Sequence, residues 1–371
     1  MNTHLASEKT PPAWLVAGGR LLVSLFVPLV LFFVLWRVFL FLRDSQSPTW
    51  LIASLAILWG VGGALALFFT SNWVIERLPG TLRHRLIPFL FVGPALAILA
   101  WYLLVPTFRT FYASLFDANG QIFVGLQNYV YAFTSRGMVE AFRNNLFWLL
   151  IVTSATVGFA LVIAVLADRT HPKFEVVAKS LIFMPMVISM VGASVIWRLI
   201  YDFRPGDAEQ IGLLNAVVTA LGQPSQAWML LKPWNNLFLM VIVIWLQTGY
   251  AMVIISAAIK AIPGELLEAA RIDGANEFRV FTKIIIPSLR GTLVTVATTI
   301  ILFTLKIFDV VQAMTGGNYG TQVIANEQYM QMFRAFHAGR SAAIAVVLLL
   351  LVIPVMIYNL RQFNQRPEAF L

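Results

Sequence analysis

The stretch 236-NLFLMVIVIWLQTGYAMVIISAA-258 contains no charged residue and is long enough to cross a membrane as a helix. An α-helix needs about 20 consecutive apolar residues to span the hydrocarbon core of a bilayer. Other stretches meet the same requirement, and the predicted spans are approximately 21–42, 50–70, 86–106, 145–167, 177–200, 236–258, 291–310 and 341–360. The sequence therefore predicts an all-α polytopic membrane protein with about eight transmembrane helices.

The composition supports this fold class and excludes several kinds of site. The chain is 59% hydrophobic and 12% charged, whereas soluble domains have about 45–50% and about 25%. There is no cysteine, and the four histidines are far apart in the sequence, so neither disulfides nor a metal site is predicted. The nucleotide-binding pattern G-x4-G-K-S/T is absent, so the chain is not expected to bind ATP through such a loop.

The segment that follows the opening stretch is 263-PGELLEAARIDGANEFRVFTKIIIPSL-289, which is polar although it lies between two predicted spans. Its pattern predicts a short helix, a turn at Gly274 and a second helix from near Asn276. Glu268 and Arg271 are three residues apart and positioned to pair along the first helix. The residues alone leave two interpretations open: a knob that docks on a cytoplasmic partner, or an amphipathic helix on the inner leaflet.

The distribution of basic residues orients the chain. With a cytoplasmic N-terminus, most of the 26 basic residues lie in inside segments, and the bias is clearest in the short loops. Both termini and the segment 263–289 are therefore predicted to be cytoplasmic. The net charge of +9 follows from this topology, and nucleic acid is not expected as a partner.

A fixed spacing of residues in this segment is similar to a known family motif. The residues that carry it are Glu268, Ala269, Ala270, Gly274, Ile284, Ile286 and Pro287. They resemble the EAA loop of binding-protein-dependent ABC importer permeases, whose pattern is E-A-A-x3-G-x9-I-x-L-P. Only Ile286 departs from the pattern, because it replaces a leucine.

Further phrases resemble the sugar-type permeases, the group that includes the maltose permease subunit with eight spans. These phrases are 123-FVGLQNY-129, 212-GLLN-215, 272-IDGA-275, 314-MTGG-317 and 339-GRSAAIAV-346. The resemblance covers roughly residues 86–365. Within it, 316-GGNYGTQVIAN-326 looks most like the α-glucoside permeases.

The resemblance implies that the loop is a coupling helix seated in a cleft of a partner ATPase. The residues that would couple to the ATPase are Glu268, Ala269, Ala270, Asp273, Gly274, Ile284 and Pro287. The chain itself would be no enzyme and would bind no cofactor, since ATP and Mg belong to the ATPase. The implied partners are a second homologous permease subunit, a dimeric ABC ATPase, an extracytoplasmic solute-binding protein, the sugar and membrane lipid. The implied location is the cytoplasmic (inner) membrane of a bacterium or archaeon.

A substrate path through the middle of the membrane is also implied. Alignment on 261-AIP-263 places Leu246, Gln247 and Tyr250 on this path, where an amide and a phenol would bind sugar hydroxyl groups. The alternative is that Gln247 hydrogen-bonds a neighbouring helix and Tyr250 only packs.

Three more residues are candidates for the path. Lys306 and Asp309 are ionisable groups in or near a predicted span. Three roles stay open for them. Both residues line the path, or they pair with each other on one helix face, or Lys306 extends its ammonium group to the outer interface. Ser189 lines the path or bonds to the backbone.

The predicted organisation has three parts. Residues 1–85 hold a cytoplasmic tail, two accessory spans and a basic loop, residues 86–365 form the six-helix permease domain with the coupling loop at 260–290, and residues 366–371 are a cytoplasmic tail. The expected cargo is a sugar or oligosaccharide, of which an α-glucoside is the first candidate. Glycerol phosphate, a polyol or another solute is the alternative. An ion-driven secondary transporter is a weaker alternative. Such a protein would be expected to have buried carboxylates in the middle of the membrane, and Asp309 is the only candidate in the sequence.

Overall fold

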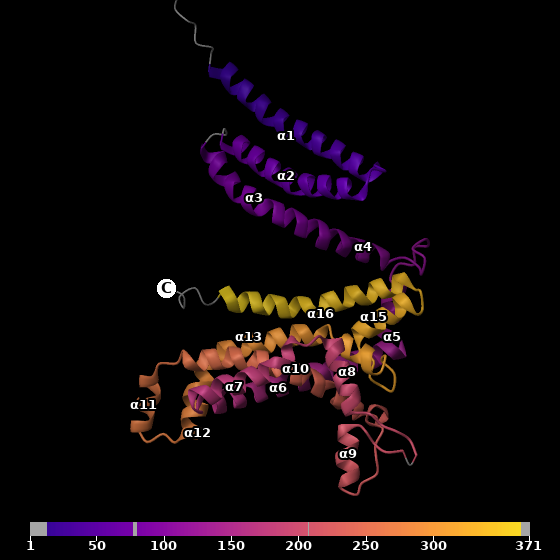
Figure 1. Ribbon diagram of the computed structural model, residues 1–371, viewed down its shortest axis with the longest axis vertical. Coiled ribbons are helices and arrows are strands. Elements are labelled where there is room, and N and C mark those ends of the chain that lie inside the picture. The colour runs from indigo at the N-terminus through magenta and orange to yellow at the C-terminus, as the bar shows by residue number, and fades with distance from the viewer. Residues whose placement is uncertain (1–12, 77–79, 207, 365–371) are drawn as a thin grey trace, which may run out of the picture. The chain divides into compact units, whose positions relative to one another are not determined.

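The protein is described by a computed structural model that covers residues 13–76, 80–206 and 208–364. Within these residues all regular secondary structure is helical, and one isolated bridge joins Phe116 and Phe123. The chain forms two compact units, Met1–Thr107 and Phe108–Leu371 (Figure 1). The predicted all-α fold is confirmed, and the domain boundaries predicted after residues 85 and 365 stay predictions.

Seven of the described helices are long and apolar enough to cross a membrane: Phe26–Asp44, Thr49–Glu76, Arg83–Ala113, Arg136–Asp168, Asn235–Lys260, Glu277–Leu305 and Ala338–Arg361. A bent pair, Pro172–Val187 and Met190–Ile200, makes an eighth if the two parts count as one span. The parts meet at 104°, so the continuous span expected at 177–200 is wrong. Pro185 lies in the 3-10 turn η2 (Met184–Val187), and Ser189 then caps a new helix.

The first unit is a bundle of long helices. It contains α1 (Ala13–Asp44), α2 (Thr49–Glu76), α3 (Gly80–Leu99) and the π turn η1 (Ala100–Leu104), which continues into α4 (Val105–Ala113). The indole nitrogen of Trp59 in α2 donates to the carbonyl oxygen of Leu35 in α1 at 2.9 Å. Gly63 lies against the side chain of Leu35, where an added Cβ would come within 3.0 Å. A polar group and a small residue thus fix how α1 and α2 pack, as is usual between membrane helices.

The second unit is built around α6 (Arg136–Asp168) and α10 (Asn235–Lys260), which pack side by side and contact α13 (Ile286–Leu305). Trp148 and Leu239 are fully buried in their common core. Gly249 lies where a Cβ would meet the backbone of α7 (Pro172–Phe183), 2.7 Å from the Cα of Phe183. The absence of a side chain there lets α7 approach α10 closely.

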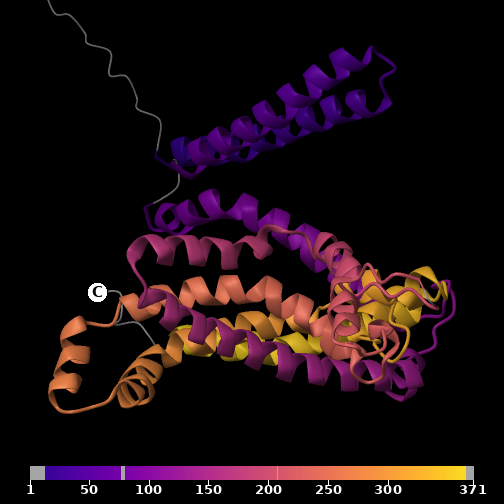
Figure 2. The same cartoon turned by 60° about the horizontal axis from the view of Figure 1, so that its bottom comes forward.

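The two ends of the second unit differ. At one end α11 (Gly264–Ile272) and α12 (Glu277–Val280) project from the helices, and the π turn η4 (Phe281–Ile285) leads into α13 (Figures 1 and 2). At the other end lie α5 (Gln127–Thr134), α8 (Met190–Ile200), α9 (Leu213–Ala220), η3 (Trp228–Leu230), α14 (Asp309–Met314), α15 (Ile324–Phe333) and the start of α16 (Ala338–Asn364). The predicted orientation makes the first end cytoplasmic and the second the outer end.

Candidate functional site

The predicted helix, glycine turn and second helix are present at the end of the second unit that is predicted to be cytoplasmic. Gly274 has φ +80°, a conformation that side-chain-bearing residues rarely adopt. The N–H of Ala275 donates to the carbonyl of Ala270 at 3.0 Å, and the N–H of Gly274 donates to that of Arg271 at 3.1 Å. This is a Schellman motif, which satisfies the last carbonyl groups of α11. The Asn276 side chain then accepts from the N–H of Arg279 at 2.9 Å and caps α12.

The ion pairs around the turn differ from the prediction. Glu268 and Arg271 do not pair, because the turn folds α12 back toward the end of α11 and offers Arg271 another carboxylate. Arg271 donates to Glu277 at 2.9 Å, and Arg169, next to the end of α6, donates to the other oxygen of Glu277 at 2.7 Å. Glu277 therefore ties α11 to α6.

The predicted coupling residues divide into exposed and half-buried ones. Glu268, Ala269, Asp273, Gly274 and Pro287 are exposed, whereas Ala270 and Ile284 are half-buried. Ala270 packs against the core of the unit, so only one of the two alanines is fully presented to a partner. Within the described residues Glu268 makes no hydrogen bond or ion pair, so its carboxylate is free for one.

A cluster of charges that the sequence did not reveal lies behind this loop. We name it the basal ion cluster, and its members are Asp168, Glu175, Lys179, Ser256 and Lys260. Lys179 of α7 binds Asp168 at the end of α6, Glu175 at 2.5 Å and Ser256 of α10 at 2.5 Å. The side chains of Asp168, Glu175 and Lys179 are 11%, 13% and 17% exposed. The cluster thus joins α7 to the C-terminal ends of α6 and α10 in a largely desolvated setting.

Lys260 connects this cluster to the loop. It pairs with Glu175 and lies three residues before Pro263, where the projecting segment begins. Together with the Arg169–Glu277 pair, it attaches the two sides of the α11–α12 segment to the first turn of α7 and to the end of α6. The only local sequence signal of the cluster is the four-residue spacing of Glu175 and Lys179.

The predicted path residues on α10 follow one another along a helix. Leu246 is 3% exposed, and Gln247 and Tyr250 are half-buried. The alternative in which Gln247 hydrogen-bonds a neighbouring helix finds no support, since no such bond is made among the described residues. Ser189 caps α8, with its hydroxyl oxygen accepting from the N–H of Gly192 at 3.1 Å, so the backbone role of this residue is observed.

Lys306 and Asp309 do not share a helix face. Helix α13 ends at Leu305, Lys306 has φ −100° and ψ 16°, and α14 begins only at Asp309. Both residues are exposed, and no ion pair joins them. The alternative in which the two residues pair is therefore wrong, because the three-residue spacing brings side chains together only where the helix continues. Their place on the substrate path stays a prediction.

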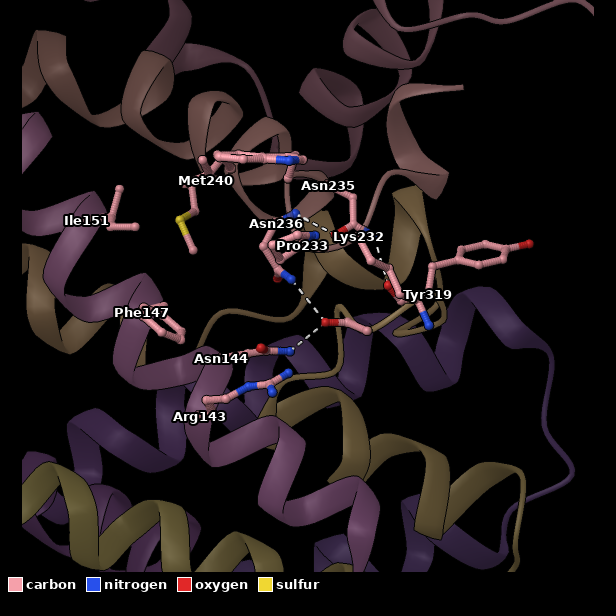
Figure 3. A pocket seen from close by; sticks show the side chains of 13 residues that line it. Arg143, Asn144, Phe147, Ile151, Lys232, Pro233, Asn235, Asn236, Met240 and Tyr319 are labelled. Carbon is pink, nitrogen blue, oxygen red and sulfur yellow. Dashed lines mark hydrogen bonds between the residues drawn. The ribbon is translucent and has the colours of Figure 1, made fainter. Parts of the chain in front are cut away.

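A cavity of about 430 Å³ lies at the end predicted to be outside, between residues 143–151 of α6, the first turns of α10 and the turn at Tyr319 and Gly320 (Figure 3). We name it the outer cavity. Asn144 donates to the carbonyls of Gly320 at 2.9 Å and Gln322 at 2.8 Å, and Asn236 donates to Gly320 at 3.0 Å. These amides hold the glycine-rich turn against the two helices.

The outer cavity was not found from the sequence, and none of the predicted path residues lines it. Its lining residues are Arg143, Asn144, Phe147, Ile151, Lys232, Pro233, Trp234, Asn235, Asn236, Leu237, Met240, Tyr319 and Gly320. The signal present in the sequence was a group of asparagines at the starts of two predicted spans, which a polar site at the boundary of the membrane would explain.

Comparison with known proteins defines the class to which this fold and loop belong. The family of binding-protein-dependent transport system inner membrane components matches residues 85–365. The chain belongs to this family, and it is the multi-pass permease subunit of an ABC importer. It is a transport component and not an enzyme, as the EAA-like spacing indicated.

Two relatives are similar over most of the chain. The osmoprotective compounds uptake permease protein GgtC of Synechocystis sp. is 53% identical over 279 residues, which cover 75% of this chain and 99% of that protein. The alpha-glucoside transport system permease protein AglF of Rhizobium meliloti is 47% identical over 327 residues, with coverages of 82% and 96%. Among solved structures, a bacterial ABC transporter involved in the import of the polysaccharide alginate has a chain with TM-score 0.67 at 16% identity. It covers 78% of this chain and 98% of that one, which supports the fold.

Proposed function

We propose that this subunit imports a sugar or oligosaccharide, in the first place an α-glucoside, which an extracytoplasmic binding protein delivers. The name of the relative AglF and the resemblance of 316-GGNYGTQVIAN-326 to α-glucoside permeases support this cargo. The name of GgtC supports a second candidate, a compound that protects against osmotic stress.

The coupling role rests on one observation: α11 projects with a free carboxylate while both sides of its loop are anchored. Among the described residues Glu268 is exposed and unpaired, whereas Glu277 attaches the loop to the end of α6 and Lys260 attaches it to the first turn of α7. A knob of this kind can accept a displacement from a partner and pass it to the membrane helices. Glu268 would meet a basic group of the ATPase, and Ala269 would allow close approach.

The assembly follows from this role. A second permease subunit would supply a second loop for the two sockets of a dimeric ATPase, which holds ATP and Mg, while this chain holds no cofactor. The termini and α11–α12 would lie in the cytoplasm. Gln247 and Tyr250, half-buried on α10, would bind sugar hydroxyl groups along the path, with Leu246, Ser189, Lys306 and Asp309 as its further members.

The test is reconstitution of the complete importer with candidate binding proteins. We expect the chain to co-purify with an ABC ATPase, and an α-glucoside with its binding protein to stimulate ATP hydrolysis and uptake. If an osmoprotective solute, a polyol or glycerol phosphate stimulated the complex instead, the proposed cargo would be wrong and the assignment to the ABC importer permeases would stand. A complex in which Glu268→Lys binds and stimulates the ATPase as the unaltered chain does would contradict the coupling role, and Glu265→Lys, on the same exposed helix, is the matched control.

A further inference from the structure

The outer cavity presents two cations without a partner. Arg143 and Lys232 are exposed, and in the described part of the chain neither side chain makes a hydrogen bond or ion pair. None of the thirteen lining residues is acidic. Glu140, one turn before Arg143 on α6, does not line the cavity and forms no ion pair with it. An arginine and a lysine left unneutralised at one cavity are suited to an anion, and above all to phosphate oxygens.

The remaining wall of the cavity is apolar and follows a helix into the membrane. Arg143, Phe147 and Ile151 are four residues apart, so they share one face of α6. The rise of about 1.5 Å per residue places Ile151 about 12 Å along the axis from Arg143. Met240 of α10 faces the same space, and Figure 3 shows these apolar side chains on one side of the cavity and Asn236 and Lys232 on the other.

The asparagine side chains of the cavity already donate hydrogen bonds to the protein backbone. Asn144 donates both amide hydrogens to backbone carbonyls, and Asn235 donates to Tyr319 at 2.8 Å and to Met229 at 3.2 Å. Besides the two cations, a sugar would find the indole of Trp234 and the hydroxyl of Tyr319, and Figure 3 shows the Tyr319 ring directed away from the other lining side chains. A ligand with one anionic group and a hydrocarbon chain would satisfy the cations and cover Phe147, which is 51% exposed.

We infer that the outer cavity binds the phosphate of an anionic glycerophospholipid. Arg143 and Lys232 contact the phosphate oxygens, and the first part of an acyl chain lies along Phe147, Ile151 and Met240. Basic pockets between transmembrane helices hold anionic lipid head groups on the matrix or cytoplasmic side of membranes, and the outer cavity offers the same chemistry at the end predicted to be outside. Its volume of about 430 Å³ is in the range of small-molecule sites. The bound lipid would add a further link between α6, α10 and the turn at Gly320, beside the buried core of the two helices and the asparagine hydrogen bonds to the turn.

The experiment compares lipids and charge variants in the complete importer. The complex is placed in nanodiscs of phosphatidylcholine with increasing phosphatidylglycerol, and lipid retained after purification is counted by native mass spectrometry alongside the thermal unfolding midpoint. We expect retained phosphatidylglycerol and a raised midpoint. Arg143→Gln and Lys232→Gln each weaken the lipid's affinity about tenfold or more, the usual effect of losing a charge-assisted hydrogen bond.

Three controls make the result decisive. Arg136→Gln, which removes an exposed arginine of the same helix that does not line the cavity, leaves the retained lipid unchanged. The charge-preserving variants Arg143→Lys and Lys232→Arg fold and keep the lipid. Inorganic phosphate, added to the complex in pure phosphatidylcholine, does not raise the midpoint.

The inference is overturned by any of three outcomes. Equal lipid retention in both glutamine variants would show that the cations do not bind it. Protection by inorganic phosphate as strong as that by the lipid would make the ligand a free anion. A change in the KM for the sugar, without loss of lipid, would assign the cavity to the transport path instead.

Discussion

Gly274 is where the structure allows the coupling role to be tested with a calculated effect. Its φ of +80° lies in the left-handed region, and a Cβ added there would meet nothing within 4 Å. Replacement by valine therefore costs only backbone strain. This strain is about 1–2 kcal/mol for an ordinary residue, and valine lies at or above the upper end because it is β-branched. A cost of that size lowers the population of the observed turn about 5–30-fold relative to relaxed turns.

The strain stays local because the turn is exposed and lies outside the spans. Gly274→Val is therefore expected to insert and assemble normally while uptake per ATP hydrolysed falls about 5–30-fold. Gly274→Asn is the matched control, because asparagine visits the left-handed region with little penalty. Uptake of labelled sugar and ATPase rates in proteoliposomes are the measurements.

Two results would refute this reasoning. Full uptake by Gly274→Val would show that the left-handed turn is not needed for coupling. Equal losses in the valine and asparagine variants would show that any side chain at the tip is harmful, which would move the cause from backbone conformation to contact with the ATPase.

Four further outcomes are expected. Glu277→Gln removes the ion pairs of Glu277 with Arg169 and Arg271. Because these side chains are half exposed, the free energy of unfolding changes by less than about 1 kcal/mol. Uptake of sugar per ATP hydrolysed in proteoliposomes nevertheless falls. Lys179→Met leaves the largely buried Asp168 carboxylate without a cation, while Lys260 still pairs with Glu175. The variant lowers unfolding stability by about 3 kcal/mol, whereas Lys179→Arg loses less in the same thermal assay. Gly339→Ala places a Cβ against two backbone carbonyl oxygens and costs about 1–3 kcal/mol in thermal unfolding, whereas unchanged stability would show that the backbone there yields freely. Two backbone N–H groups that donate to the Asp117 carboxylate lower its pKa. The turn from Asp117 to Ile122 therefore gains stability from the ionised carboxylate, and this gain is complete above the unfolded pKa of about 3.9. The turn loses the gain as the pH falls through the lower pKa of the folded state. Hydrogen exchange should show that loss, and Asp117→Asn should remove the pH dependence.

Features set by local sequence were predictable. The spans followed from the length of apolar runs, and the turn at Gly274 followed from a glycine placed at the end of an amphipathic helix. Each depends on interactions within a few residues, where periodicity and capping rules apply.

Features set by packing were not predictable from one sequence. Arg169 and Glu277 are 108 residues apart, and Asp168 and Ser256 are 88 apart, so no local pattern signals their contact. Arg271 was expected to pair with Glu268 in its own helix, but it pairs with Glu277, which the turn brings close to it. The outer cavity likewise depends on how two helices and a distant turn meet.

The ion pairs and the outer cavity lie at opposite ends of the same two helices, which suggests how a displacement would travel. Buried side chains such as Trp148 and Leu239 join α6 and α10 between the two ends, so the pair should move as one body. The motion must then be absorbed where the helices are interrupted, at the 104° bend before Met190 and at the break after Leu305. Spin-label distances between α6 and α10 should therefore stay constant through the ATPase cycle, while distances from α8 to α10 change. The opposite pattern would place the hinge between the two long helices and refute this account of coupling.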